Sequence, residues 1–221
     1  MSPFLRCLLC LALAVSAGGC TSTPAAWLRT YGLAEQPRPE GLTVCTSFAC
    51  VGTARTALTP EEWERVRALF VPDPSDAAAE RATAARAVGL LEEMVGAKVG
   101  TGQDRAEDTV GGEDSGQLDC IAEAANTTEY LLLMARDGLL PRHRVATPAH
   151  RGFLVFWPHS TAVLEELDGG TAYAVDSWYG ANGEAAKVWT LAAWESWETD
   201  GEDVGTLLAR TGGRPEPGRL P

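Results

Sequence analysis

The longest helical pattern in the chain, residues 119–137, is followed by a half in which the apolar residues change to a period of about two. Gly138 comes directly after the helical pattern, as glycine does where helices end. Downstream, residues 153–157, 160–167 and 171–179 are rich in β-branched and aromatic side chains. A helix followed by consecutive antiparallel strands predicts an α+β fold.

Two helices are expected before this one. Residues 59–62, Thr-Pro-Glu-Glu, form a capping box with proline at the first helical position, so a short helix should begin there and end near Pro72. A second, alanine-rich helix should run from about Asp76 to Val95, with Gly96 as its stop. Residues 188–197 are expected to hold the end of a strand and a short helix.

The turn residues 168–170, Asp-Gly-Gly, predict a hairpin between the second and third strands. A two-residue loop there places Asp176 opposite Thr161 or Val163. Both partners lie an even number of residues from His159, and side chains alternate along a strand with period two. We therefore expect His159 and Asp176 on the same face of the sheet; a three-residue loop without a bulge would separate them.

The N-terminal residues predict an export signal. Residues 1–19 carry one charge, Arg6, and the apolar run 7–15 is too short to span a bilayer. The signal ends in Ala17-Gly18-Gly19-Cys20, which resembles the lipobox at which bacterial lipoproteins are cleaved and acylated on the cysteine. Cleavage near Ala17 by an ordinary signal peptidase is the alternative.

The lipobox reading divides the chain into four parts. Residues 1–19 are the signal peptide, 20–40 a lipidated tether, 41–200 one domain and 201–221 a flexible tail, with residues 24–44 as an extended lead-in. Thr21 lacks the acidic character that retains such proteins in the inner membrane. This predicts membrane anchoring through lipid, facing the periplasm at the outer membrane.

The remaining cysteines differ in role. Cys45 and Cys50 enclose four residues and, in an oxidising compartment, should form a local disulfide. Cys120 is left without a partner, and a leftover thiol in a chain that also holds histidines is a candidate nucleophile.

Charge excludes one class of partner. The net charge is −12, and no basic cluster is present that would match a phosphate backbone. Nucleic acid is therefore not expected as a partner.

Cys120 lies in the first turn of the 119–137 helix, where free backbone N–H groups and the helix dipole favour a thiolate. The histidines outside the signal are His143, His150 and His159, and the first two are expected in loops. His159 shares its face with Asp176, which would fix the imidazole tautomer.

Asp119-Cys120 at a helix start, Pro158–Val163 opening a strand and Tyr173–Trp178 on the next resemble the transglutaminase-like branch of the papain-like superfamily. The resemblance covers residues 117–180. It implies a papain/transglutaminase-like core with a catalytic helix ahead of an antiparallel sheet. It also implies Cys120 as nucleophile, His159 as base and Asp176 as orienter, in acyl transfer through a thioester.

Many transglutaminases have tryptophan directly after the cysteine, where this chain has Ile121. This disfavours glutamine cross-linking and favours a peptidase, amidase or acyltransferase. The backbone N–H of Cys120 and the side chain of Gln117 are candidate oxyanion donors, and Trp178 is placed near the site. No cofactor and no metal are implied.

The expected function is a lipid-anchored cysteine hydrolase or acyltransferase that acts on a peptide, protein or cell-wall amide. Four simpler readings remain open: Cys120 as a core thiol, a zinc site that includes Cys120 and His159, residues 100–116 as a plain solvated loop rather than a flap, and an inactive envelope lipoprotein that serves as a binding or scaffold module.

Overall fold

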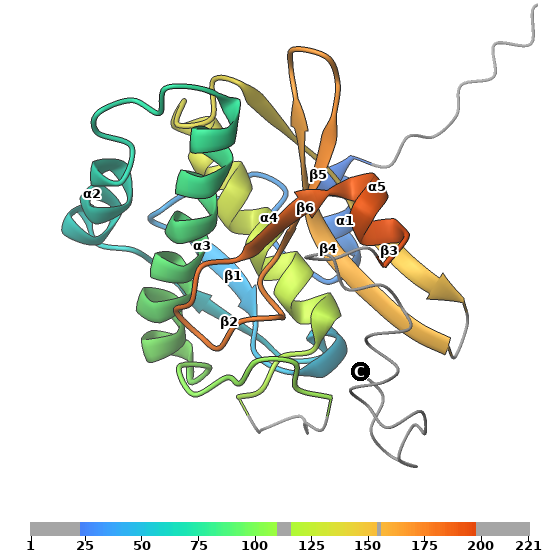
Figure 1. The fold of residues 1–221 in the computed structure, drawn as a ribbon. Coiled ribbons are helices and arrows are strands. Elements are labelled where there is room, and N and C mark those ends of the chain that lie inside the picture. The colour runs from blue at the N-terminus through green and yellow to red at the C-terminus, as the bar shows by residue number, and fades with distance from the viewer. Residues whose placement is uncertain (1–22, 110–115, 154–155, 198–221) are drawn as a thin grey trace, which may run out of the picture.

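The computed structural model describes residues 23–109, 116–153 and 156–197, without the side chains of 153–157. Both ends of the chain, including the predicted signal, Cys20 and the tail, lie outside the described residues. The chain folds as α+β (Figure 1). The helices are α1 (Pro24–Thr30), a 3-10 turn (Phe48–Cys50), α2 (Pro60–Ala68), α3 (Ala77–Val99), α4 (Cys120–Arg136) and α5 (Leu191–Glu195).

Two antiparallel sheets accompany these helices. The small one pairs β1 (Leu42–Cys45) with β2 (Thr53–Thr56). The larger has the order β3 (His143–Phe153), β4 (Phe156–Glu166), β5 (Ala172–Asp176) and β6 (Lys187–Thr190). Each strand pairs with its neighbour in sequence, so the sheet is a meander.

Helix α4 lies between this sheet and α3 (Figure 1). Its buried residues Tyr130, Leu131 and Met134 join one apolar core with Leu91 of α3 and Leu164 of β4. Because α4 is apolar on more than one side, it can be covered by α3 on one side and by the sheet on the other. This packing holds α4 against the sheet.

The two predicted helices before α4 are present, and the second is longer than expected. Thr59 and Glu62 form the reciprocal capping box of α2. Helix α3 passes through Gly96 and ends at Gly100, whose φ of 91° only glycine adopts readily. Gly96 serves close packing instead of termination, since a Cβ there would lie 2.7 Å from the Asn182 side chain.

Strand β3 was not predicted. His143 and His150 were expected in loops, and residues 153–157 in one strand, but Phe153 ends β3 and Phe156 begins β4, and the two residues pair with each other. β3 is an edge strand with a register shift between Ala146 and Ala149, and this irregularity admits Pro148. Its charged side chains and its proline hide the strand signal in the sequence.

The register between β4 and β5 agrees with the prediction. Ala162 pairs with Val175 and Leu164 with Tyr173, a pairing that continues to Thr161 opposite Asp176. His159 and Asp176 consequently project from one face.

The expected extended lead-in is wrong at residues 24–30, which form α1. Thr23 caps this helix and Pro24 occupies its first turn. Leu28 is fully buried in a second apolar cluster with Leu118 and Ala122 at the start of α4. The predicted Cys45–Cys50 disulfide is formed and belongs to the same cluster.

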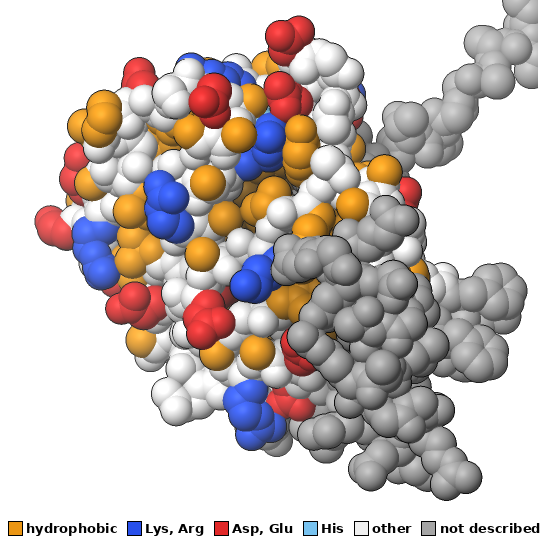
Figure 2. Space-filling model, viewed as in Figure 1, with side chains coloured by type: hydrophobic (Ala, Val, Ile, Leu, Met, Phe, Trp, Pro, Cys, Tyr) orange, Lys and Arg blue, Asp and Glu red, His pale blue; other side chains and the backbone are white. Residues whose placement is uncertain are grey.

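No helix among the described residues has the length and apolarity needed to cross a membrane. On the face drawn in Figure 2, Lys and Arg side chains are separated by acidic, apolar and uncharged residues rather than gathered into one patch.

Candidate active site

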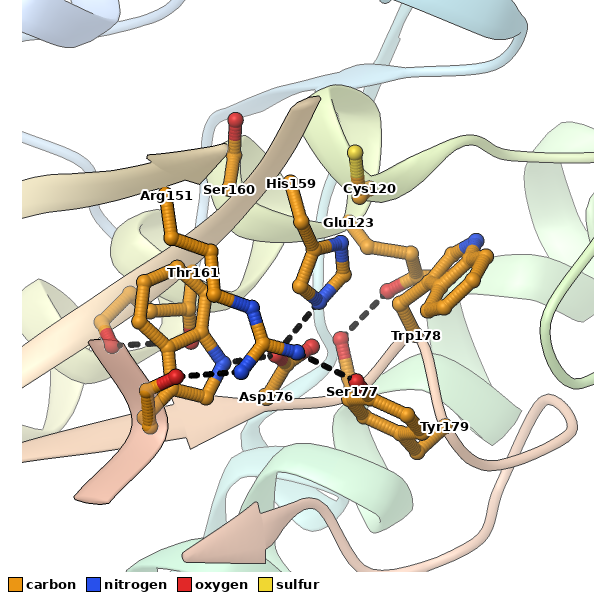
Figure 3. Close-up of polar contacts among 12 residues, drawn as sticks. Cys120, Glu123, Arg151, His159, Ser160, Thr161, Asp176, Ser177, Trp178 and Tyr179 are labelled. Atoms are coloured by element: carbon orange, nitrogen blue, oxygen red, sulfur yellow. Dashed lines mark hydrogen bonds and ion pairs between the residues drawn. The ribbon is translucent and has the colours of Figure 1, made fainter. Parts of the chain in front are cut away.

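His159 and Asp176 form a buried pair at the start of β4 and the end of β5. His159 Nε2 lies 2.7 Å from Asp176 Oδ2, and the two side chains are 6% and 2% exposed. An ionised carboxylate can only accept, so Nε2 is the nitrogen that carries hydrogen and Nδ1 of a neutral ring keeps its lone pair. Figure 3 shows Nδ1 on the edge of the ring opposite Asp176.

Cys120 is the first residue of α4, at the place that the sequence predicted. Asp119 caps the helix, accepting a hydrogen bond from Ala122 N at 2.9 Å. The Cys120 Sγ donates to the backbone carbonyl of Pro158 over 3.8 Å, and in Figure 3 the sulfur points away from the imidazole. A turn about χ1 is needed before the thiol can pass its proton to Nδ1.

The expectation that helix position favours a thiolate at Cys120 is not met. Burial, followed by the negative charge of Asp119, raises the pKa of Cys120 to about 12. The N–H groups at the start of α4 do not offset the loss of solvation. Burial at this position therefore favours the neutral thiol over the thiolate.

Three aromatic rings surround His159. The centroid of Trp178 lies 4.7 Å from that of His159, and those of Tyr179 and Trp194 lie 5.5 Å away. Trp178, which the sequence placed near the site, donates through Nε1 to the carbonyl of Asp108 at 3.2 Å. The rings exclude water, which strengthens the electrostatic contact between His159 and Asp176.

Trp194 and Arg151 were missed by the sequence reasoning. Trp194 Nε1 donates to Asp176 Oδ2 at 2.8 Å, the same oxygen that His159 contacts. Arg151 pairs with His159 across β3 and β4, donates to Tyr179 Oη at 2.6 Å and to the Trp194 carbonyl, and lies over the Trp194 ring. Because β3 was not recognised as a strand, no sequence signal pointed to Arg151.

Three buried carboxyl groups lie close together behind the site. They come from α3 (Glu92), from the loop between α3 and α4 (Asp104) and from α4 (Glu123). Glu123, one turn beyond Cys120, accepts a 2.5 Å hydrogen bond from Ser177, which also lies 2.8 Å from Thr127. Burial, and then the charges of Glu92 and Asp104, raise the pKa of Glu123 well above its usual value. Burial raises the pKa of Glu92 to about 8 and also raises that of Asp104.

Gln117, the candidate oxyanion donor, is buried and bonded to the preceding loop. Its Nε2 donates to the carbonyl of Gln103 at 2.8 Å, and its Oε1 accepts from Arg105 N at 3.2 Å. These bonds tie the loop to the start of α4. Within the described part of residues 100–116, Thr101, Asp104 and Asp108 are buried, so this stretch packs against the domain.

The other two histidines lie in β3 rather than in loops. His143 is buried, with Nδ1 2.8 Å from Glu80 Oε1. His150 Nδ1 lies 2.8 Å from Ser160 Oγ, and burial lowers its pKa. Among the described residues, no group of three or more His, Cys, Asp and Glu side chains is arranged to hold a metal ion.

Comparison with known proteins gave no match to any family model, to any curated protein or to any solved structure.

Proposed function

We propose that this chain is a lipid-anchored cysteine hydrolase or acyltransferase of the cell envelope that acts on peptide, protein or cell-wall amides. The observation that carries the proposal is the buried 2.7 Å contact of His159 with Asp176 on the sheet against which Cys120 begins α4. The chain order and the helix-then-sheet arrangement also suit a papain/transglutaminase-like core.

The chemistry begins with transfer of the thiol proton to Nδ1 of His159. The sulfur then forms a bond to the acyl carbon, and the C–N bond breaks as the imidazolium returns this proton to the leaving amine. Water or an acceptor amine then attacks the thioester, the C–S bond breaks, and the Cys120 thiol is released. Asp176 holds the Nε2–H tautomer and balances the imidazolium. The backbone N–H of Cys120 is the proposed oxyanion donor, because the bonds of Gln117 commit its amide elsewhere.

The envelope location rests on the sequence. Cys20 after a short apolar signal supports lipid attachment, and the Cys45–Cys50 disulfide suits an oxidising compartment. We propose anchoring at the outer membrane, facing the periplasm.

The test uses an activated acyl donor, because the physiological amide is not needed to reveal the nucleophile. The mature protein is mixed with p-nitrophenyl acetate, and the adduct is located by mass spectrometry. We expect acetylation at Cys120, loss of the adduct in Cys120→Ala, and acylation at least ~100-fold slower in His159→Ala. Asp137→Asn, which alters a carboxylate bonded to Trp63 and Arg67 at the opposite end of α4 from Cys120, is the matched control.

A binding or scaffold module is the second candidate. The observation in its favour is the neutral thiol, bonded to the Pro158 carbonyl and with its pKa raised to about 12. Cys120 that stays unacylated, or is acylated equally fast without His159, would overturn the enzyme proposal and leave this one.

A further inference from the structure

The second donor to Asp176 comes from the short helix after the sheet. Trp194 lies in α5 and is fully buried, and its Nε1–H bonds to the oxygen that His159 also contacts. An oxygen that accepts two hydrogen bonds at 2.7 and 2.8 Å is fixed in direction. The indole therefore opposes rotation of the carboxylate away from the imidazole.

Trp194 is itself held by a buried cation. The Arg151 guanidinium carbon lies 4.3 Å from the Trp194 ring centroid and 3.8 Å from that of Trp197. One guanidinium nitrogen donates to the Trp194 carbonyl and another to the Tyr179 hydroxyl. Burial lowers the pKa of Arg151, while the charges of Tyr179 and Asp176 act in the opposite direction.

The interactions of Arg151 secure the backbone of α5 as well as its indole. In Figure 3, Arg151 and Asp176 lie on the same side of the ring of His159, opposite to the sulfur of Cys120. The connection runs from the edge strand β3, through α5, to the end of β5. No element of this connection comes from α4.

We propose that Trp194 is a positioning residue of the site, which orients Asp176 toward His159 and is supported by Arg151. Trp194 does not touch the reacting atoms, and it acts through Asp176 on the tautomer of His159. The effect of Trp194 on catalysis rests on the proposed function. The main test measures the tautomer of His159 and needs no catalytic activity.

The test replaces the indole donor in the full-length mature protein with Trp194→Phe, and measures the ring-nitrogen NMR signals of His159, assigned by comparison with His159→Ala. In the wild type, the neutral ring should carry its hydrogen on Nε2. In Trp194→Phe we expect a mixed population, with the Nε2–H signal broadened or lost. Retention of the wild-type signals would overturn the proposal.

The matched control is Trp63→Phe. Trp63 is also buried and donates through Nε1 to an aspartate, Asp137 Oδ2, at 3.1 Å, but it lies on α2. It should change stability by an amount similar to that of Trp194→Phe and leave the His159 signals unchanged. A change of the same kind in both variants would show a general loosening and would overturn the positioning role.

A double variant separates positioning from packing. In the Asp176→Asn background, Trp194→Phe should add nothing to the change in the His159 signals, because the indole acts through that carboxylate. An additive change would contradict the proposal. Should Trp194→Phe fail to fold, Arg151→Lys removes the planar support while keeping the charge, and should give a smaller change in the same direction.

The acylation assay gives a second readout. Trp194→Phe should acylate Cys120 about tenfold more slowly, within the range expected for a displaced catalytic group. An Nε2–H signal in the wild type that is broadened or lost in Trp194→Phe, in a protein whose Cys120 is not acylated, would reject the proposed function and keep the positioning role. Acylation that is unaffected by Trp194→Phe, with unchanged signals, would reject only the positioning role.

Discussion

Ser177 donates a 2.5 Å hydrogen bond to Glu123, and so joins the residue after Asp176 to the helical turn that follows Cys120. The strand end that orients the histidine and the helix that carries the thiol are thereby tied together. This contact lies beneath the site and fixes the distance between its two halves.

Removal of this hydroxyl should destabilise the protein. Ser177→Ala leaves buried Glu123 and Thr127 without a partner at this point, at a cost of about 2 kcal/mol in the free energy of unfolding. Urea denaturation measures it. Ser75→Ala is the matched control, because exposed Ser75 also donates to a carboxylate, that of Asp76 at 3.1 Å, and should change stability by less than about 0.5 kcal/mol.

Stability should fall as the pH rises through the neutral range. The pKa of Glu92 is about 8 in the folded state, against 4.5 as the reference value, so between these values the folded state binds more protons than the unfolded state. Glu92 therefore lowers the unfolding free energy across this window by on the order of 4 kcal/mol as the pH rises.

Glu92→Gln, measured by denaturation at a series of pH values, should make this decline shallower, and the decline that remains should come from Glu129, whose pKa burial also raises to about 8. Exposed Glu93, its neighbour in α3, provides the control, and Glu93→Gln should leave the decline as in the wild type. A wild-type stability that rises over the same window would contradict the assignment of a protonated carboxyl cluster.

The pH dependence of Cys120 alkylation should be that of a thiol which is neutral at physiological pH. With the pKa raised to about 12, the rate with iodoacetamide should be low at neutral pH and still be increasing at pH 10. A rate that is already on a plateau below about pH 6 would reveal a preformed thiolate–imidazolium pair instead.

The number of free thiols should distinguish the two cleavage alternatives. With Cys20 acylated and Cys45 joined to Cys50, Cys120 is the single thiol left in the mature chain. Titration of the unreduced, denatured protein with a thiol reagent should give one equivalent. Two equivalents, without attached lipid in the mass spectrum, would indicate cleavage near Ala17.

The parts of the fold with regular periods were predictable. The capping box of α2, the pattern of α4 and the register between β4 and β5 all followed from local rules. The placement of His159 and Asp176 on one face followed from parity and the assumed length of the turn at residues 168–170.

The missed parts depend on distant contacts. β3 is an edge strand with a proline and several charges, so its pairing with β4 is what makes it a strand. The raised pKa of Cys120 was not foreseen, because helix position is a local property, whereas the burial that raises this pKa depends on the packing of the whole domain. Trp194 could not be connected to Asp176 from sequence spacing.

If Cys20 carries the proposed lipid, the position of helix α1 limits how far the domain can stand from the membrane. Its cap, Thr23, is three residues after Cys20, so the chain between a lipid on Cys20 and the start of α1 could span at most about 11 Å. Because α1 packs against the start of α4, lipid attached this close to α1 would keep the Cys120 end of the domain near the bilayer. The substrates that such an arrangement reaches most readily are those held at the membrane surface.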